Sequence, residues 1–498
     1  MRKLFNNILD NKTYFWATLA VTFVVTRLTV WFYPINSDHW IFFYVGKIFS
    51  QGGTLYVSAW DHKPPMIFVF NGLMSLILGS NLIIHRIFLT LLAILSIYLF
   101  YLLAKIIIPK LNLQNSDRLI KLSVILFAFW ANLSQFTSSG NNTENFGSIF
   151  LLLMFLSYFW FRHSSNRWFL FLSGACLSIL FFLKGTFLLL ALPVGVEMLL
   201  SKRGLKNIIL DILVFIAPIF LHAGIWIWYF ASRGVMHDFI VASFSFSSKY
   251  VKSSWLGHVS SNKVTFLAIM SPIFVIFLIF GIKFLSEIKT GIKQSIYRFL
   301  LFWALGSFVI GLFAGDFYPY YFLIFIPAFI FILIYWQDIY LKTLDLKRGF
   351  VIAILILSMI VSLGMAYKQF YNYFAGSGKA EITEFQQIAD YIDANSVPSD
   401  KIFFYSYGAT MYHLANRDSG SRFVSASVLL LDEREKYGFN FSDTFISDME
   451  KSKPKFVIMA IDPNDLYYEN AKISSYLRAN FKPVKTFDTF FVAENNNL

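Results

Sequence analysis

The stretch Trp60-Asp61-His62-Lys63-Pro64-Pro65 is a short charged segment in a chain made mostly of long apolar runs. A second acidic position, Asp38, lies upstream of it and closely follows the apolar run 14–33. A run of about 20 apolar residues is the length that a helix needs to cross a bilayer. The sequence therefore predicts that both charged positions lie at a membrane surface, after a first membrane span.

Composition places the chain among polytopic membrane proteins. Of its 498 residues, 57% are hydrophobic, 19% are aromatic and only 14% are charged, which lies outside the range of soluble proteins. The net charge of +13 comes mainly from short loops between apolar runs, so the positive-inside rule explains it better than nucleic-acid binding. The single Cys176 excludes an internal disulfide. The first run is long and contains Arg27, and we interpret it as an uncleaved span rather than a signal peptide.

Eleven apolar runs are long enough, or nearly so, to cross the membrane as helices. They are 14–33, 82–108, 119–137, 145–161, 168–183, 186–200, 207–230, 264–284, 297–314, 317–336 and 349–367. With eleven spans, the loops rich in Lys and Arg all fall on the same side as the N-terminus, which is the inner face. The outer face then carries 34–81, 138–144, 184–185, 231–263, 315–316 and all residues after 367.

The run from Met66 to Gly79 is short for a span, and counting it as one would move every later basic loop to the outer face. We therefore predict a helix that lies in or dips into the outer interface and begins at the Pro64-Pro65 pair. The chain becomes polar from residue 376 onward. Helical patterns at 381–395 and 473–480 and β-rich runs at 401–407, 456–461 and 490–494 predict a small exoplasmic α/β domain over 376–498. Residues 1–375 form the membrane domain, with 34–81 as its first exoplasmic loop.

Asp38 is the candidate general base, because a carboxylate at the membrane surface is partly removed from water and can accept a proton. The alternative is a helix cap for the segment 40–49. Asp61 can position an acceptor, share a divalent cation with Asp38 or pair with Lys63; no other cofactor is indicated. Lys63, held in extended backbone before a proline, suits a phosphate at head-group level, and its alternative is ordinary interfacial anchoring.

Glu144 and Lys184 lie at the ends of short spans on the predicted outer face. Ionisable groups at membrane depth default to functional hypotheses, although a Glu at a helix N-terminus can also be a plain dipole partner. Arg27 is expected to pair with an acidic residue or to extend toward the surface, which is a structural role. Tyr318, Tyr320 and Tyr321 can stack on sugar rings or belong to an interfacial aromatic belt. The sequence contains no phosphate-binding loop, dinucleotide fingerprint, nucleophile elbow or zinc signature.

With these residues the chain resembles the GT-C superfamily of membrane glycosyltransferases, in the branch of protein O-mannosyltransferase-like and aminoarabinose-transferase-like enzymes. That family opens its first exoplasmic loop with an acidic motif, closes it with Asp-x-Lys-Pro-Pro, begins a later span with Thr-Glu and places a Tyr-rich motif before a late span. The counterparts here are Asp38, 61–65, 143–144 and 317–321 with Pro327, and 406–417 resembles the small C-terminal domain. The chain departs from the family at His39, Asp316 and Tyr320. These differences are consistent with a different donor sugar or acceptor.

The resemblance implies a GT-C fold of about 11 to 13 transmembrane helices and inverting transfer from a polyprenyl-phosphate sugar. Asp38 would deprotonate an acceptor hydroxyl, while Lys63 and Lys184 would stabilise the leaving phosphate. The resemblance also implies that the acceptor is a lipid, glycan or protein of the cell envelope. It implies that the protein lies in the inner or plasma membrane. The alternatives are a lipid-linked oligosaccharide polymerase or ligase, and a transporter, although the paired half-sequences typical of transporters are not seen.

Overall fold

The computed structural model describes residues 9–32, 37–246, 248, 295–313, 318–343, 356–357, 359–368, 371–372, 375, 377–429, 439–462 and 470–497. By contacts, the chain divides into two compact units. The first consists of Met1–Tyr33, Arg86–Trp226 and Val251–Phe370, and the second of Pro34–His85, Ile227–Tyr250 and Tyr371–Leu498. The second unit therefore joins the predicted C-terminal domain to most of the predicted first outer loop.

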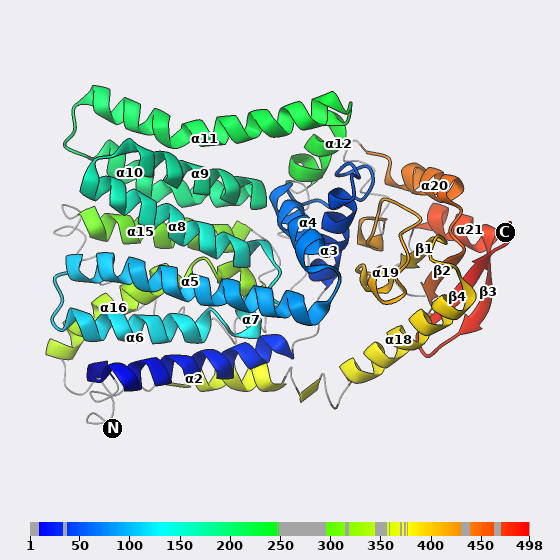
Figure 1. Cartoon of the computed structure of the whole chain (residues 1–498), viewed down its shortest axis with the longest axis horizontal. Coiled ribbons are helices and arrows are strands. Elements are labelled where there is room, and N and C mark those ends of the chain that lie inside the picture. Colours follow the sequence, from blue (N-terminus) through cyan, green and yellow to red (C-terminus); the bar gives the residue numbers. More distant parts are fainter. Residues whose placement is uncertain are drawn as a thin grey trace. The chain divides into compact units, whose positions relative to one another are not determined.

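The first unit is a bundle of helices, drawn side by side in Figure 1. Its elements are α2 (Lys12–Trp31), α5 (Leu82–Lys110), α6 (Ser116–Trp130), α7 (Ser134–Thr137), α8 (Thr143–Ser164), α9 (Arg167–Leu183), the 3-10 helix η1 (Gly185–Ala191), α10 (Leu192–Leu199), α11 (Leu205–Ser232), α15 (Ser295–Phe313), the 3-10 helix η3 (Pro319–Phe322) and α16 (Ile326–Thr343). The first residues of α5 and the last of α11 belong to the second unit. Within the bundle α8 packs against α9, α2 against α6, and α10 against α15.

Among the described residues, five helices are long and apolar enough to cross a membrane: α2, α5, α8, α11 and α15. They correspond to five of the predicted runs. The run 119–137 is divided into α6 and α7, and 186–200 begins as η1 and continues as α10. The run 264–284 lies outside the described residues, and the full count of eleven spans stays a prediction.

Ion pairs join the loops that the charge rule assigns to the inner face. Asp211 binds Arg167 and Arg203, in each case with N and O atoms 2.7 Å apart. Glu197 lies 2.9 Å from Arg298 and 3.5 Å from Arg162. The loops around 162–167 and 202–206 therefore meet at one end of the bundle, as the grouping of basic loops predicts.

In the second unit, α3 (Ser37–Ser50) packs closely on α4 (Met66–Leu78). A Cβ atom built on Gly46 would lie 2.6 Å from the backbone nitrogen of Gly72, so only glycine permits this approach. The helix α4 follows Pro65 and ends at Gly79, whose φ of +66° favours glycine. The predicted helix over 66–79 is confirmed, and its position in the membrane interface stays a prediction.

The C-terminal part of this unit has a four-stranded mixed sheet in the order β1-β2-β4-β3. Its strands are β1 (Ile402–Tyr405), β2 (Phe456–Ala460), β3 (Phe481–Thr486) and β4 (Phe490–Asn495), and its main helices are α18 (Ser377–Asn395), α19 (Thr410–Leu414), α20 (Phe441–Ser452) and α21 (Ala471–Asn480). β1 pairs with β2 in parallel, and the other two pairings are antiparallel. Every residue of β1 and β2 is buried, which explains their continuous apolar sequence.

Candidate functional site

Asp38 and Lys63, from the two charged segments of the first outer loop, lie in the second unit. Each is near the beginning of one of two packed helices. Asp38 is in the first turn of α3 and is half-buried. Lys63 is two residues before Pro65, the N-cap of α4. A carboxylate in a first helical turn is favoured by the helix dipole. The same dipole at the start of α4, together with an ammonium, favours an anion. No ion pair joins Asp38 to Lys63 among the described residues.

Asp61, His62 and Lys63 form one local cluster. The carboxylate of Asp61 accepts a hydrogen bond from the Lys63 backbone N–H at 3.2 Å and lies 3.3 Å from His62 Nδ1. The Lys63 ammonium lies 2.9 Å from His62 Nε2, rather than on Asp61. The hydroxyl of Tyr56 donates to the Lys63 carbonyl at 2.9 Å and accepts from Ser243. These bonds fix the backbone of the motif, and the ammonium contacts the His62 ring rather than a carboxylate.

Asp61 is buried, at 7% exposure. Burial alone would raise the pKa of its carboxyl group, but His62 and Lys63 outweigh that effect and hold the pKa below its ordinary value. Asp61 is therefore ionised at neutral pH. It is suited to orient His62 and the Lys63 backbone rather than to remove a proton from a substrate.

The C-terminal domain lies directly against α3, which the sequence did not reveal. Gly408 has a φ of +111°, and a Cβ atom there would be 3.0 Å from the Cβ of Ser37. The ring of His413 lies 4.3 Å from that of Trp40, and the Ser419 N–H donates to the Tyr44 hydroxyl at 2.7 Å. In the sequence, the segment Ser406-Tyr407-Gly408 was the available signal of this contact. Its glycine is required where the loop passes Ser37, the residue before Asp38.

A second cluster of predicted residues lies in the first unit. Glu144, in the first turn of α8, is 1% exposed and lies 2.7 Å from the Lys184 ammonium. Its other oxygen accepts from the Thr143 hydroxyl at 2.8 Å. The Lys184 ammonium also lies 4.0 Å from the centre of the Tyr321 ring, within the range of a cation–π contact. The structure thus joins three segments that the loop-charge rule assigned to the outer face.

The predicted tyrosines continue this cluster. Tyr318 and Tyr320 stack with their ring centres 5.4 Å apart, and Tyr320 lies edge-on to Tyr321 at 4.6 Å. All three side chains are half-buried. Asp316 lies outside the described residues. Such a group of partly exposed rings offers aromatic faces of the kind that stack on sugars.

The expectation for Arg27 is wrong within the described residues. Its side chain is 5% exposed, so it does not extend to the surface, and no carboxylate there pairs with it. Its Nε donates to the Thr90 hydroxyl at 3.2 Å. For metals, the described residues contain no group of three or more His, Cys, Asp or Glu side chains that could hold an ion; a cation shared by Asp38 and Asp61 stays untested.

Neither a protein-family model nor a curated protein sequence matches the chain. Solved structures do. ArnT from Cupriavidus metallidurans, bound to undecaprenyl phosphate, aligns with a TM-score of 0.57 at 13% identity over 96% of this chain and 97% of that chain. The Archaeoglobus fulgidus oligosaccharyltransferase in its apo form aligns with a TM-score of 0.56 at 13% identity over 96% of this chain and 74% of that chain. Its complex with an inhibitory peptide and a dolichol-phosphate aligns with a TM-score of 0.53 at 12% identity over 97% of this chain and 74% of that chain.

The chain has a fold similar to that of GT-C membrane glycosyltransferases. At this level of identity the likeness concerns the fold alone. The comparisons thus support a GT-C-like fold and a multi-pass membrane protein. They do not distinguish the branch of the superfamily that the sequence predicted. The oligosaccharyltransferase and ArnT align almost equally well, but only ArnT is covered over nearly its full length.

Proposed function

We propose that this protein is an inverting glycosyltransferase. It moves a sugar from a polyprenyl-phosphate donor to a hydroxyl group of a cell-envelope acceptor on the outer face of the membrane. The observation that carries the proposal is the close pairing of α3 and α4. Asp38 lies in the first turn of α3, and α4 begins directly after Lys63-Pro64-Pro65. Two GT-C structures of similar fold hold undecaprenyl phosphate and dolichol-phosphate, which supports a donor of this chemical class.

In the proposed reaction Asp38 removes the proton from the acceptor hydroxyl. The resulting oxygen attacks the anomeric carbon from the side opposite the phosphate, and the bond from that carbon to the phosphate oxygen breaks. The electron pair leaves with the polyprenyl phosphate, which needs no proton if positive charge stabilises it. Lys63 supplies that charge, and the free N–H groups at the start of α4 add to it.

The first-unit cluster receives a different role. The Lys184 ammonium lies 2.7 Å from Glu144, so its charge is compensated within the first unit. We assign Glu144 and Lys184 to holding Tyr321 in place, and Tyr318, Tyr320 and Tyr321 to a stacking surface for a carbohydrate on that unit. The C-terminal domain stands on the outer face in this proposal, and its Gly408 loop supports the first turn of α3.

A single transferred sugar is favoured over an oligosaccharide. The alignment covers 97% of ArnT but 74% of the oligosaccharyltransferase, so the latter contains additional structure without a counterpart in the alignment. The mass added to the product separates the two possibilities, because one sugar and an oligosaccharide differ by several sugar masses.

The test uses membranes from cells that express the protein, the Asp38→Asn variant or the matched Asp117→Asn variant. Asp117 undergoes the same chemical change but is an exposed residue that pairs with Lys121. Glycolipids and glycoproteins are compared by mass spectrometry, and transfer is measured in detergent with labelled undecaprenyl-phosphate sugars. We expect a product in wild type and Asp117→Asn and none in folded Asp38→Asn. Full transfer by Asp38→Asn, or solute uptake into proteoliposomes without any product, would overturn the proposal.

A further inference from the structure

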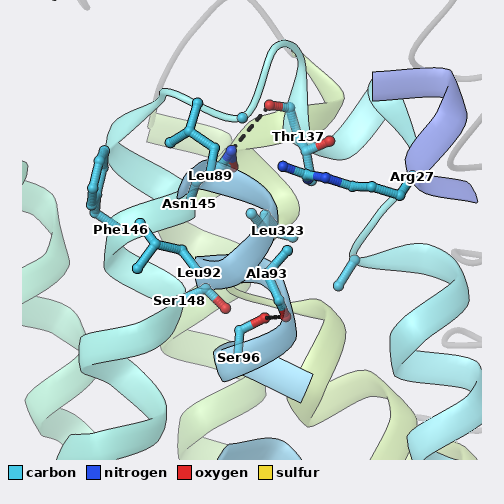
Figure 2. Close-up of a pocket in the computed structure, with 12 residues that line it drawn as sticks. Arg27, Leu89, Leu92, Ala93, Ser96, Thr137, Asn145, Phe146, Ser148 and Leu323 are labelled. Atoms are coloured by element: carbon cyan, nitrogen blue, oxygen red, sulfur yellow. Dashed lines mark hydrogen bonds between the residues drawn. The ribbon is translucent and has the colours of Figure 1, made fainter. Parts of the chain in front are cut away.

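Arg27 lines a small cavity inside the first unit. The centres of water-sized molecules have about 30 Å³ of space in it. Apolar walls come from residues of α5, α8 and the η3–α16 connection, among them Leu89, Phe146 and Leu323. Figure 2 shows the Arg27 side chain extending from α2 into the space between Thr137 and Leu89. The cavity is separate from the cluster around Glu144 and Lys184 in its lining residues.

Among the residues that the structure describes, no carboxylate forms an ion pair with Arg27 in this cavity. Arg27 is 5% exposed, and its single described hydrogen bond, from Nε to Thr90, leaves its two terminal nitrogens unused. Arg86 lies near enough to interact with it electrostatically and carries the same sign of charge. A buried charge without a partner is costly in a low-dielectric environment. The buried guanidinium of Arg27 therefore indicates a place for an anion.

Two polar atoms on α8 also lack partners and line the same cavity. Ser148 is 3% exposed, and its hydroxyl makes no hydrogen bond. A serine in a helix ordinarily donates to the carbonyl four residues earlier, so a hydroxyl left unused at this position points to another acceptor. Asn145 donates from Nδ2 to the Thr137 carbonyl at 3.1 Å, while its Oδ1 has no partner. Figure 2 shows both side chains on the cavity side of α8.

The backbone also makes room for the guanidinium. Gly140 has a φ of +89°, and a Cβ atom built there would lie 3.3 Å from a terminal nitrogen of Arg27. The Arg27 charge and the Ser148 hydroxyl both favour a negative ligand, and the free Asn145 oxygen can accept from a hydroxyl that the ligand carries.

We propose that the Arg27 cavity binds a phosphate group, with Arg27 as its counter-charge and Ser148 as a hydrogen-bond donor. Arg27 is four residues from the end of a predicted membrane span, and the walls are apolar, so the phosphate belongs either to the head group of a membrane lipid or to free phosphate that enters from outside. The proposal concerns binding and does not depend on sugar transfer. It can fail or succeed without affecting the role of Asp38.

The experiment measures the melting temperature of the purified full-length protein in detergent. One arm adds inorganic phosphate against sodium chloride of equal ionic strength, and the other adds dioleoyl phosphatidylglycerol against dioleoylglycerol. For wild type, we expect a rise of about 2–5 °C at a ligand concentration about a hundredfold above Kd. If the melting temperature rises in both arms, inorganic phosphate alone is sufficient for binding. If it rises only with phosphatidylglycerol, the bound phosphate belongs to a lipid head group.

Variants decide whether the rise comes from this cavity. Arg27→Gln removes the unpaired charge, so we expect no rise and a basal melting temperature equal to or above that of wild type. Arg118→Gln is the charge-matched control, because Arg118 is exposed and paired with Asp10, and it keeps the full rise. If Arg27→Gln does not fold, Ser148→Ala serves instead and should lose at least half of the rise. The absence of a rise in wild type, or an equal rise in folded Arg27→Gln or in Ser148→Ala, would overturn the proposal.

Discussion

The ammonium nitrogen of Lys184 lies 2.7 Å from Oε1 of Glu144, and this contact joins the end of α9 to the first turn of α8. The carboxylate is almost completely buried, whereas the lysine side chain keeps 17% of its surface exposed. Because Lys184 also lies over the Tyr321 ring, the pair orients the last of the three clustered tyrosines. The ion pair is therefore a support for the aromatic cluster as well as a link between helices.

Replacing one partner of this pair should be more harmful than replacing both. Glu144→Gln leaves the Lys184 ammonium without its counter-charge and should lower the free energy of unfolding by about 2–4 kcal/mol, less than for a fully enclosed pair because Lys184 is partly exposed. The double variant Glu144→Gln with Lys184→Gln should lose less than Glu144→Gln alone. A double-mutant cycle from melting curves in detergent measures the coupling, and strictly additive losses would contradict it.

Protonation of His413 should destabilise the protein at acidic pH. Burial, followed by the charges of His85 and Lys47, lowers the pKa of His413 from 6.5 to about 4. The unfolded chain therefore binds more protons between these values, so the stability from the neutral ring is complete above pH 6.5 and is lost as pH falls toward 4. The loss amounts to at most about 3 kcal/mol.

The variant His413→Phe keeps a ring against Trp40, which lies 4.3 Å from the histidine ring, but cannot take up a proton. Its melting temperature should decline less than that of wild type as pH is lowered from 6.5 to 4, where both limits come from the pKa values above. Parallel declines in the two proteins would show that another group is responsible for the acid sensitivity.

Lys63 should affect the rate of transfer more than the binding of the acceptor. If its ammonium stabilises the departing phosphate, Lys63→Gln should lower kcat by about 10²–10³-fold, the range for loss of one transition-state donor. Lys63→Arg keeps the charge and should retain a larger fraction of the activity. The matched control is Lys47→Gln, which removes a surface cation paired with Asp418. A change in the KM for the acceptor with unchanged kcat would argue for a binding role instead.

Hydropathy predicted the long helices well because a bilayer requires each span to satisfy its own backbone hydrogen bonds over a fixed length. Loop charge likewise grouped Glu144, Lys184 and the tyrosines on one face, and the structure brings them into contact. In the C-terminal domain the buried strands β1 and β2 and the partly buried β4 follow from their apolar runs. The edge strand β3 does not, because its sequence Phe-Lys-Pro-Val-Lys-Thr is exposed after the first residue and contains a proline.

The sites that sequence reasoning missed depend on contacts between distant segments. Nothing in the pattern around Arg27 shows that Gly140 lies beside its guanidinium group or that Ser148 lines the same cavity. A lone arginine in a span has two ordinary explanations, pairing and extension to the surface, and within the described part of the chain only the surrounding side chains argue against both. In the same way, the glycine at 408 could be noticed as part of a motif, but its proximity to Ser37 required coordinates.

The approach of α3 to α4 gives the last prediction, because it tests whether these helices must be held closely for the site to work. Gly46→Ala would place a Cβ atom 2.6 Å from the Gly72 backbone nitrogen, so the helices must separate. We expect a loss of about 1–3 kcal/mol in unfolding free energy. We also expect a larger relative loss of transfer, because Asp38 is in one displaced helix and Lys63 directly precedes the other. Gly195→Ala, on α10 with no atom within 4 Å of its Cβ position, is the control and should be neutral or slightly stabilising. Unchanged stability and transfer in Gly46→Ala would mean that the two helices do not need this contact, and the assignment of the site to their paired beginnings would lose its structural basis.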